Sequence, residues 1–208
     1  MKFQISAVLL GIAASTVAAQ ETNQTGPFFL HIKGTDNSSI DGYASSCHAG
    51  AAIEGLCYGS GSAPAAGSYS NEYYFNYSGY TTVGDADVGT LSWKLPVNIN
   101  GTVENLPQPM SLQYQANSNV AAPMFGFSSG GFSVGFDDEG KLFGYNYYDD
   151  STFVAGTQPS AGEGKAYYQW YVCYQYLTGY YYQSIGWAQT VPPHNPTCEP
   201  VTITQELE

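Results

Sequence analysis

The chain of 208 residues contains no arginine, and its five basic residues, all lysines, are set against 17 aspartate and glutamate residues. The formal net charge is −12 at pH 7. An acidic surface repels the phosphate backbone of DNA and RNA, so nucleic-acid binding is disfavoured and no nucleic-acid partner is expected. The acidity is explained by solubility in an acidic extracellular medium, and it indicates no particular partner.

Long apolar runs are absent after the first 20 residues. Lys2 precedes a mainly apolar stretch from Phe3 to Ala14, and the small residues Val17-Ala18-Ala19 come directly before Gln20. This order of basic, apolar and small residues predicts a secretory signal peptide at residues 1–19. Residues 20–208 are then expected to form one secreted domain, extracellular or in the cell wall. No later segment approaches the ~20 apolar residues of a spanning helix, so no membrane span is expected.

Cysteine is scarce, and its spacing does not suit a metal site. No two cysteines have the C-x-x-C spacing of zinc ligands, and the three histidines stand apart, so no metal or other cofactor is expected. An even number of cysteines in a secreted chain predicts two disulfides. Pairings within short loops are favoured, although crossed pairings stay open because distant strands can be neighbours in a sheet. The favoured pairs are Cys47–Cys57 and Cys173–Cys198.

Helical periodicity is almost absent after Gln20. Glycine, serine, asparagine and proline interrupt the chain every few residues, and apolar residues alternate with polar ones. The clearest hairpin runs from Tyr168 to Ala188 around the turn Leu177-Thr178-Gly179. Many short strands of this kind predict a single all-β domain, a two-sheet β-sandwich of the jelly-roll type, with a closed β-barrel as the alternative.

One segment matches a catalytic motif. Gly126-Phe127-Ser128-Ser129-Gly130 has the G-x-S-x-G pattern of the elbow that carries the nucleophile of α/β-hydrolases, and His194 follows later in the chain. That elbow requires a helix directly after the serine, whereas Gly131 to Gly135 is typical of a glycine-rich approach to a strand. We therefore interpret the segment as a β-turn and expect no catalytic residue in it.

Carboxylates form no clear catalytic or calcium-binding pattern either. Glu72 lies in an aromatic strand like those that carry a glycosidase nucleophile, but Tyr180 to Trp187 supplies no second acid. The acidic segments Asp85–Asp87 and Asp137–Glu139 lack the EF-hand spacing and are predicted to be hairpin turns.

Tyrosine is the most informative residue that is present, with 19 copies against 10 phenylalanines. Most of these rings are expected to fill and edge a β core, whereas an exposed ring can stack on a sugar. Strand alternation separates Tyr181 from Tyr180 and Tyr182. Because Ile185 and Trp187 share the side of Tyr181, that side is expected to face the core. Tyr180 and Tyr182 are then the expected exposed pair and the candidate glycan-binding residues.

Glycosylation is expected on the domain itself. Four N-x-S/T sequons behind a signal peptide predict that at least one asparagine carries a glycan. The four asparagines are Asn23, Asn37, Asn76 and Asn100.

The signal peptide, the segment Cys47–Ala52 and the closing stretch Tyr181–Cys198 resemble small secreted proteins of filamentous ascomycete fungi. Some of those are described as cell-wall proteins, and most have no assigned activity. The resemblance implies an extracellular or wall location and carries over no functional residue. We expect a non-catalytic secreted or wall-associated protein that binds a cell-wall polysaccharide or another glycan through surface tyrosines. A small secreted hydrolase, glycosidase or esterase, is the alternative.

Overall fold

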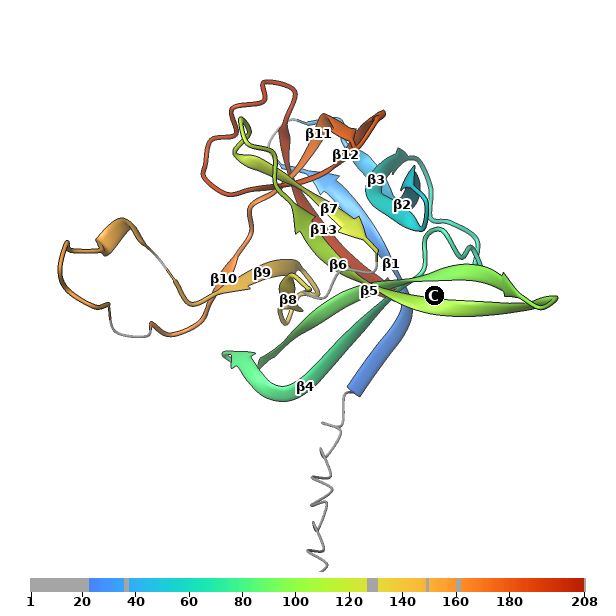
Figure 1. Cartoon of the computed structure of the whole chain (residues 1–208), viewed down its shortest axis with the longest axis horizontal. Helices are drawn as coiled ribbons and strands as arrows, with labels where there is room; N and C mark the ends of the chain where they lie inside the picture. Colours follow the sequence, from blue (N-terminus) through green and yellow to red (C-terminus); the bar gives the residue numbers. More distant parts are fainter. Residues whose placement is uncertain (1–22, 36–37, 127–130, 149, 160–161, 208) are drawn as a thin grey trace, which may run out of the picture.

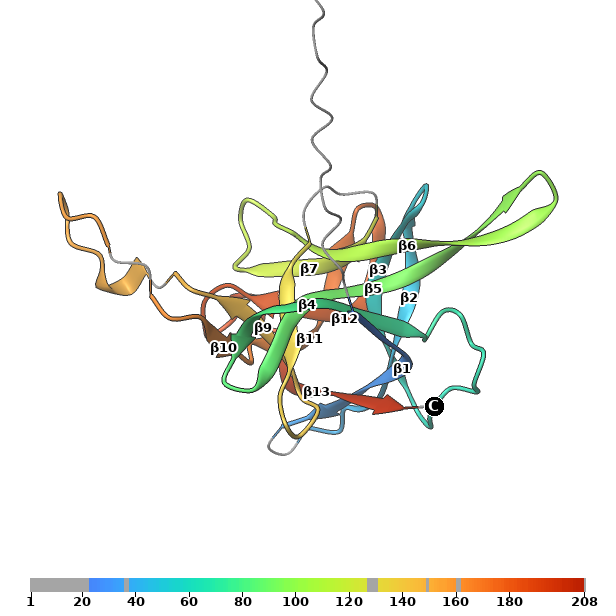
Figure 2. The same ribbon diagram turned by 90° about the horizontal axis from the view of Figure 1, so that it is seen from below.

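The computed structural model describes residues 23–35, 38–126, 131–148, 150–159 and 162–207 (Figures 1 and 2). These residues form thirteen strands and one short 3-10 helix, and they contain no α-helix. The elements are β1 (Asn23–Gly34), β2 (Asp41–Gly50), β3 (Ile53–Ser60), β4 (Tyr73–Val83), β5 (Ala86–Ile99), β6 (Thr102–Gln113), β7 (Val120–Phe125), β8 (Ser133–Phe136), β9 (Leu142–Asn146), η1 (Asp150–Thr152), β10 (Lys165–Tyr167), β11 (Trp170–Leu177), β12 (Tyr180–Ala188) and β13 (Glu199–Leu207).

The sheet closes on itself. Nine antiparallel strands form a barrel in the order β1, β4, β5, β6, β7, β3, β12, β11, β13 and back to β1. Strand β2 pairs with both β1 and β3, and β8, β9 and β10 extend the sheet from β5. The β5–β6 hairpin projects on one side of the barrel, and the segment between β9 and β10 projects on the other (Figures 1 and 2).

The all-β prediction is confirmed, but the jelly-roll sandwich is wrong and the closed barrel is correct. Alternation along a strand indicates which side chains face inward, and it does so equally in a sandwich and in a barrel. What closes this sheet is the pairing of β1 with β13, in which Phe28 lies opposite Leu207. Because β1 and β13 lie at opposite ends of the sequence, no local sequence pattern indicates that they pair.

One apolar cluster fills the barrel. On β1, Phe28, Leu30 and Ile32 point inward and are fully buried. The rings of Trp170 and Trp187 lie 4.8 Å apart between centroids, in an edge-to-face arrangement. The indole N–H of Trp170 donates to a backbone oxygen 2.9 Å away, so this large ring is buried with its one polar group satisfied.

Both predicted disulfides are confirmed. Cys47–Cys57 joins β2 to β3, and Cys173–Cys198 joins β11 to the segment before β13. The first lies beside a second, smaller apolar cluster outside the main core, made of Ala49, Cys57, Ala122, Met124 and Leu177.

A histidine lies between two carboxylates where β1 meets β2 and β13. His31 Nε2 is 2.7 Å from Asp41 Oδ1, and its Nδ1 is 3.3 Å from Glu206 Oε1. The Tyr43 hydroxyl donates to the other oxygen of Glu206 at 2.8 Å. The hydrogen bond with His31 holds the pKa of Asp41 below its ordinary value, and the Glu206 carboxylate raises the pKa of Tyr43 to about 12.

We expect Asp41→Asn to lower the melting temperature at neutral pH and to make unfolding less sensitive to acid. Because the folded pKa of Asp41 is lowered, its contribution to stability is present above the unfolded pKa of about 3.9 and is lost as the pH falls through the lower folded value. Thermal unfolding from pH 7 to pH 2 should therefore show the curves of wild type and variant converging below about pH 4. A gap of constant size across this range would contradict the interpretation.

Candidate functional site

A cleft of about 910 Å³ opens beside the end of β12, where the described residues of the segment 147–164, here called the arm, leave the barrel. Its lining is rich in aromatic rings and in amide side chains. The rings are those of Tyr114, Phe132, Tyr145, Tyr148, Phe153, Tyr167 and Trp187, and the amides those of Asn146, Gln169 and Gln189.

The barrel core fixes the floor of the cleft. Phe132 lies 5.1 Å from Trp187 and 6.2 Å from Trp170, between ring centroids. Trp187 is only 8% exposed, so the core holds one face of the ring while the cleft receives its remaining surface. A Cβ at Gly144 would overlap Trp187 and Phe132, which explains why glycine is needed where β9 passes under these rings.

The arm supplies the rim of the cleft. Asn146 Oδ1 accepts the backbone N–H groups of Tyr147 and Tyr148 at 2.8 and 3.2 Å, which fixes the turn at the start of the arm. Tyr148 and Phe153 are about half exposed, and their rings lie 6.4 Å apart. A neighbouring pocket of about 340 Å³ shares Tyr148, Phe153 and Tyr167, so the cleft continues into the arm.

The lining is almost uncharged. Among the described residues that line the cleft, Asp150 is the only carboxylate and none is basic. Ring faces bind apolar C–H surfaces, and amides and tyrosine hydroxyls both donate and accept hydrogen bonds. This combination suits a neutral ligand that has apolar faces and many hydroxyl groups.

The predicted pair Tyr180 and Tyr182 lies elsewhere, at the far end of β12. Tyr180 is 43% exposed, whereas Tyr182 packs partly buried against the smaller cluster and donates its hydroxyl to the backbone oxygen of His48. Tyr181, expected to face the core, is 58% exposed. The side of β12 that carries Tyr181 faces the core at Ile185. The strand extends beyond the end of the barrel, however, and Tyr181 lies in that part. The orientation prediction is therefore wrong for Tyr181, and glycan binding by Tyr180 and Tyr182 stays a prediction.

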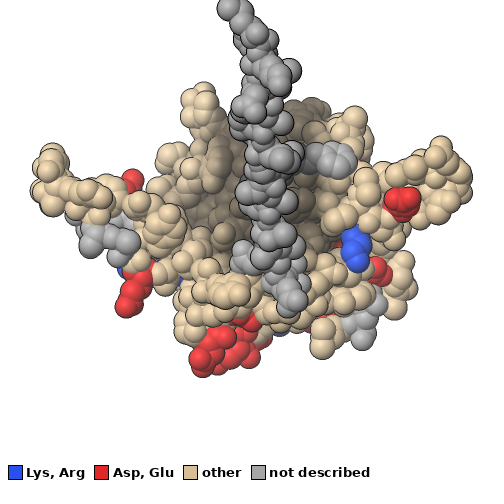
Figure 3. Space-filling model, turned by 60° about the horizontal axis from the view of Figure 1, so that its bottom comes forward, with Lys and Arg blue, Asp and Glu red and all other residues tan. Residues whose placement is uncertain are grey.

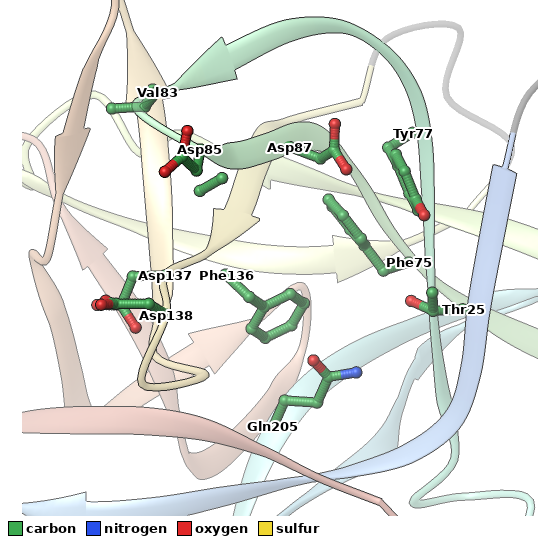
Figure 4. Close-up of a pocket in the computed structure, with 11 residues that line it drawn as sticks. Thr25, Phe75, Tyr77, Val83, Asp85, Asp87, Phe136, Asp137, Asp138 and Gln205 are labelled. Atoms are coloured by element: carbon green, nitrogen blue, oxygen red, sulfur yellow. The ribbon is translucent and has the colours of Figure 1, made fainter.

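The two acidic turns, far apart in the sequence, meet at another pocket of about 550 Å³. Figure 4 shows Asp85, Asp87, Asp137 and Asp138 around it, with aromatic rings between them. Asp137 Oδ1 accepts backbone N–H groups at 2.8 and 3.0 Å, and its Oδ2 accepts the Tyr168 hydroxyl at 2.8 Å. This carboxylate therefore stabilises the hairpin turn. In the described part of the chain, no three histidine, cysteine or acidic residues are grouped to hold a metal ion.

The predicted β-turn at Gly126-to-Gly130 is only partly visible, because residues 127–130, including Ser128, lie outside the described residues. The chain that follows runs through Phe132 into strand β8, where a nucleophile elbow would begin a helix. His194 lies in a loop in which its backbone N–H donates to Asn119 Oδ1 at 2.7 Å.

The sequons differ in their surroundings. Asn23 and Asn100 are exposed, and Asn37 lies outside the described residues. The Asn76 amide nitrogen, to which a glycan would be joined, donates instead to the buried Ser92 hydroxyl at 2.8 Å. Glycosylation stays a prediction, and of the three sequon asparagines that the structure describes, Asn23 and Asn100 are open to it.

Comparison with known families adds a classification. Residues 25–207 match the family model described as a domain of unknown function, DUF7907. The chain belongs to this family. No curated protein and no solved structure matches it. The match begins inside β1 and ends at the last residue of β13, so it includes all or most of each described strand of the DUF7907 domain. Across the residues described, this domain has no helix long and apolar enough to cross a bilayer.

Proposed function

We propose that the protein is a non-catalytic secreted or cell-wall-associated protein that binds a neutral glycan chain in the aromatic cleft. The observation that carries this proposal is the gathering of seven aromatic rings, from segments spread between Tyr114 and Trp187, around one open hollow. Their arrangement combines a floor fixed by the barrel core with a half-exposed rim. A site of this kind is organised before the ligand arrives, which lowers the entropy lost on binding.

The polar groups of the cleft support a sugar ligand. Gln169 and Gln189 each offer an amide that donates and accepts, as the hydroxyl groups of a sugar require. Asn146 adds the NH2 donor of its amide, because its oxygen accepts the backbone N–H groups at the start of the arm. Stacking of rings on the C–H faces of pyranose units supplies the apolar part of recognition. Hydrogen bonds from the amides then determine which sugar is preferred.

The charge of the protein supports a neutral rather than an acidic glycan. Figure 3 shows a face that is largely uncharged, with a few acidic patches and fewer basic ones. A polyuronate would approach an acidic protein against charge repulsion, and no described residue that lines the cleft itself is a cation. Lys165 lines the adjoining pocket, where the Glu163 carboxylate accompanies it. The two disulfides are compatible with the oxidising extracellular location where such glycans occur.

The test is calorimetric titration with soluble fragments of β-glucan, cellulose and chitin, with oligogalacturonate as the acidic comparison. We expect saturable binding of at least one neutral fragment and none of oligogalacturonate. Binding of the acidic fragment alone, or of no fragment, would contradict the proposal. Recovering the neutral fragment after long incubation distinguishes the hydrolase alternative, because a binding protein leaves it intact and a glycosidase shortens it.

A further inference from the structure

Three exposed tyrosines on the β11–β12 hairpin are connected by ring contacts through Tyr181 and form what we call the tyrosine ladder: Tyr174, Tyr176 and Tyr181. The ring of Tyr181 lies 5.7 Å from that of Tyr174, nearly parallel to it, and 5.0 Å from that of Tyr176, tilted by 48°. The exposed fractions are 45% for Tyr174, 67% for Tyr176 and 58% for Tyr181. Contact between phenol rings is thus combined with open access from solvent.

The fold explains why this face is uncovered. On β11, the side that is buried at Trp170 and Val172 continues outward as Tyr174 and Tyr176. The hairpin extends beyond the barrel there, and its opposite side, at Cys173 and Leu177, is the one that is buried. The ladder therefore lies on the side of the hairpin that faces the core within the barrel, at the point where the hairpin has passed the end of the barrel.

The backbone under the ladder is held firmly. Tyr176 and Tyr181 are direct partners in the register of the two strands. The backbone N–H of Tyr174 donates to Thr197 Oγ1, and its backbone oxygen accepts from Asn195 Nδ2, both at 3.0 Å. The adjacent Cys173–Cys198 disulfide ties the same segment to β11. The paired strands therefore hold the backbones that carry the three rings at a fixed separation.

We propose that the tyrosine ladder is a site of oxidative coupling, at which a one-electron oxidant such as a haem peroxidase with hydrogen peroxide joins Tyr181 to Tyr176 or Tyr174. Each of two phenols loses one electron and one proton. The two radicals form one carbon–carbon bond between ring positions ortho to the hydroxyl groups, and each ring then transfers its ortho hydrogen to oxygen as a proton. Two hydrogen atoms leave in total, and one hydrogen peroxide is reduced to two water molecules.

Tyr181 is the hub of the site because it alone contacts both partners. Another exposed pair in contact, Tyr147 and Tyr148 at 4.7 Å, consists of sequence neighbours in the arm, with no strand pairing to hold their rings for coupling. Tyr80 is 81% exposed and serves as a control for exposure alone. The inference does not depend on glycan binding.

The experiment treats the dilute full-length protein with peroxidase and limiting hydrogen peroxide, isolates the monomer and maps cross-linked peptides by mass spectrometry. We expect a monomer lighter by two hydrogen atoms, with the link between Tyr181 and a tyrosine of β11. Tyr181→Phe keeps a ring in place but should abolish this link, whereas Tyr80→Phe and the double variant Tyr147→Phe/Tyr148→Phe should retain it.

A link at Tyr147–Tyr148 or elsewhere instead of the ladder would overturn the proposal, as would coupling only between molecules. So would an unchanged yield of the monomer lighter by two hydrogen atoms in a Tyr181→Phe protein with the wild-type melting temperature. Glycan titration of Tyr181→Phe keeps the two proposals separate, because Tyr181 does not line the cleft and its replacement should leave glycan binding unchanged.

Discussion

Replacing Tyr148 and Phe153 together by alanine is expected to weaken glycan binding by roughly 10- to 100-fold. These two rings form the wall that the cleft shares with the neighbouring pocket of the arm. A well-placed aromatic contact contributes about 0.5–1.5 kcal/mol, and every 1.4 kcal/mol changes a dissociation constant about tenfold. Calorimetric titration with the tightest neutral fragment of the screen measures the change directly.

The controls separate loss of the site from loss of the fold. Both rings are about half exposed, so their removal leaves the barrel core intact and the melting temperature near that of wild type. Tyr80→Ala removes an equally large and more exposed ring that does not line the cleft and should leave the affinity unchanged. An unchanged dissociation constant in the double variant would place the glycan somewhere other than the cleft.

Trp170→Ala is expected to lower the free energy of unfolding by about 3–5 kcal/mol. The side chain is 1% exposed, contacts Trp187 and Phe132 and fills the centre of the core. Truncation removes the buried ring and also leaves the backbone oxygen of Leu142 without the indole donor. Urea unfolding followed by circular dichroism measures the loss.

Trp170→Phe is the matched variant, because it retains a ring and removes the indole donor. It should cost less than the alanine variant, and the difference between the two reports the packing of the ring. A loss below about 1 kcal/mol for Trp170→Ala would mean that the barrel core does not depend on this ring, contrary to the burial seen here.

Short-range features of the sequence predicted the local structure well. Both disulfides close short loops, and the hairpin turn at Leu177-Thr178-Gly179 lies between β11 and β12 as expected. Alternation correctly placed Ile185 and Trp187 inside. Alternation failed at Tyr181 because the pattern indicates only on which side of a strand a residue lies. The neighbouring strands determine where along that strand the core ends.

The cleft could not be predicted from the sequence, because it too depends on how distant strands pair. Tyr114, Phe132, Tyr148 and Trp187 lie in four separate segments, and only the pairing of strands brings them together. The one local signal was the density of aromatic residues in and around the arm, such as Tyr145 to Tyr148, which resembles ordinary strand composition. Tyr180 and Tyr182 were predicted because alternation puts them together on one side of a single strand, and a shared side of one strand does not make a cleft.

The most direct test of the central claim uses the three tryptophans as probes. In the spectrum of protein labelled with ¹⁵N at the indole nitrogens, Trp187 reports on the cleft floor. Trp93 is 2% exposed and donates its indole N–H to the backbone oxygen of Tyr69 outside the cleft. During titration with the tightest neutral oligosaccharide, the Trp187 signal should shift saturably with the calorimetric dissociation constant while the Trp93 signal stays in place. Saturable binding that leaves the Trp187 signal unmoved would contradict the assignment of the cleft as the glycan site.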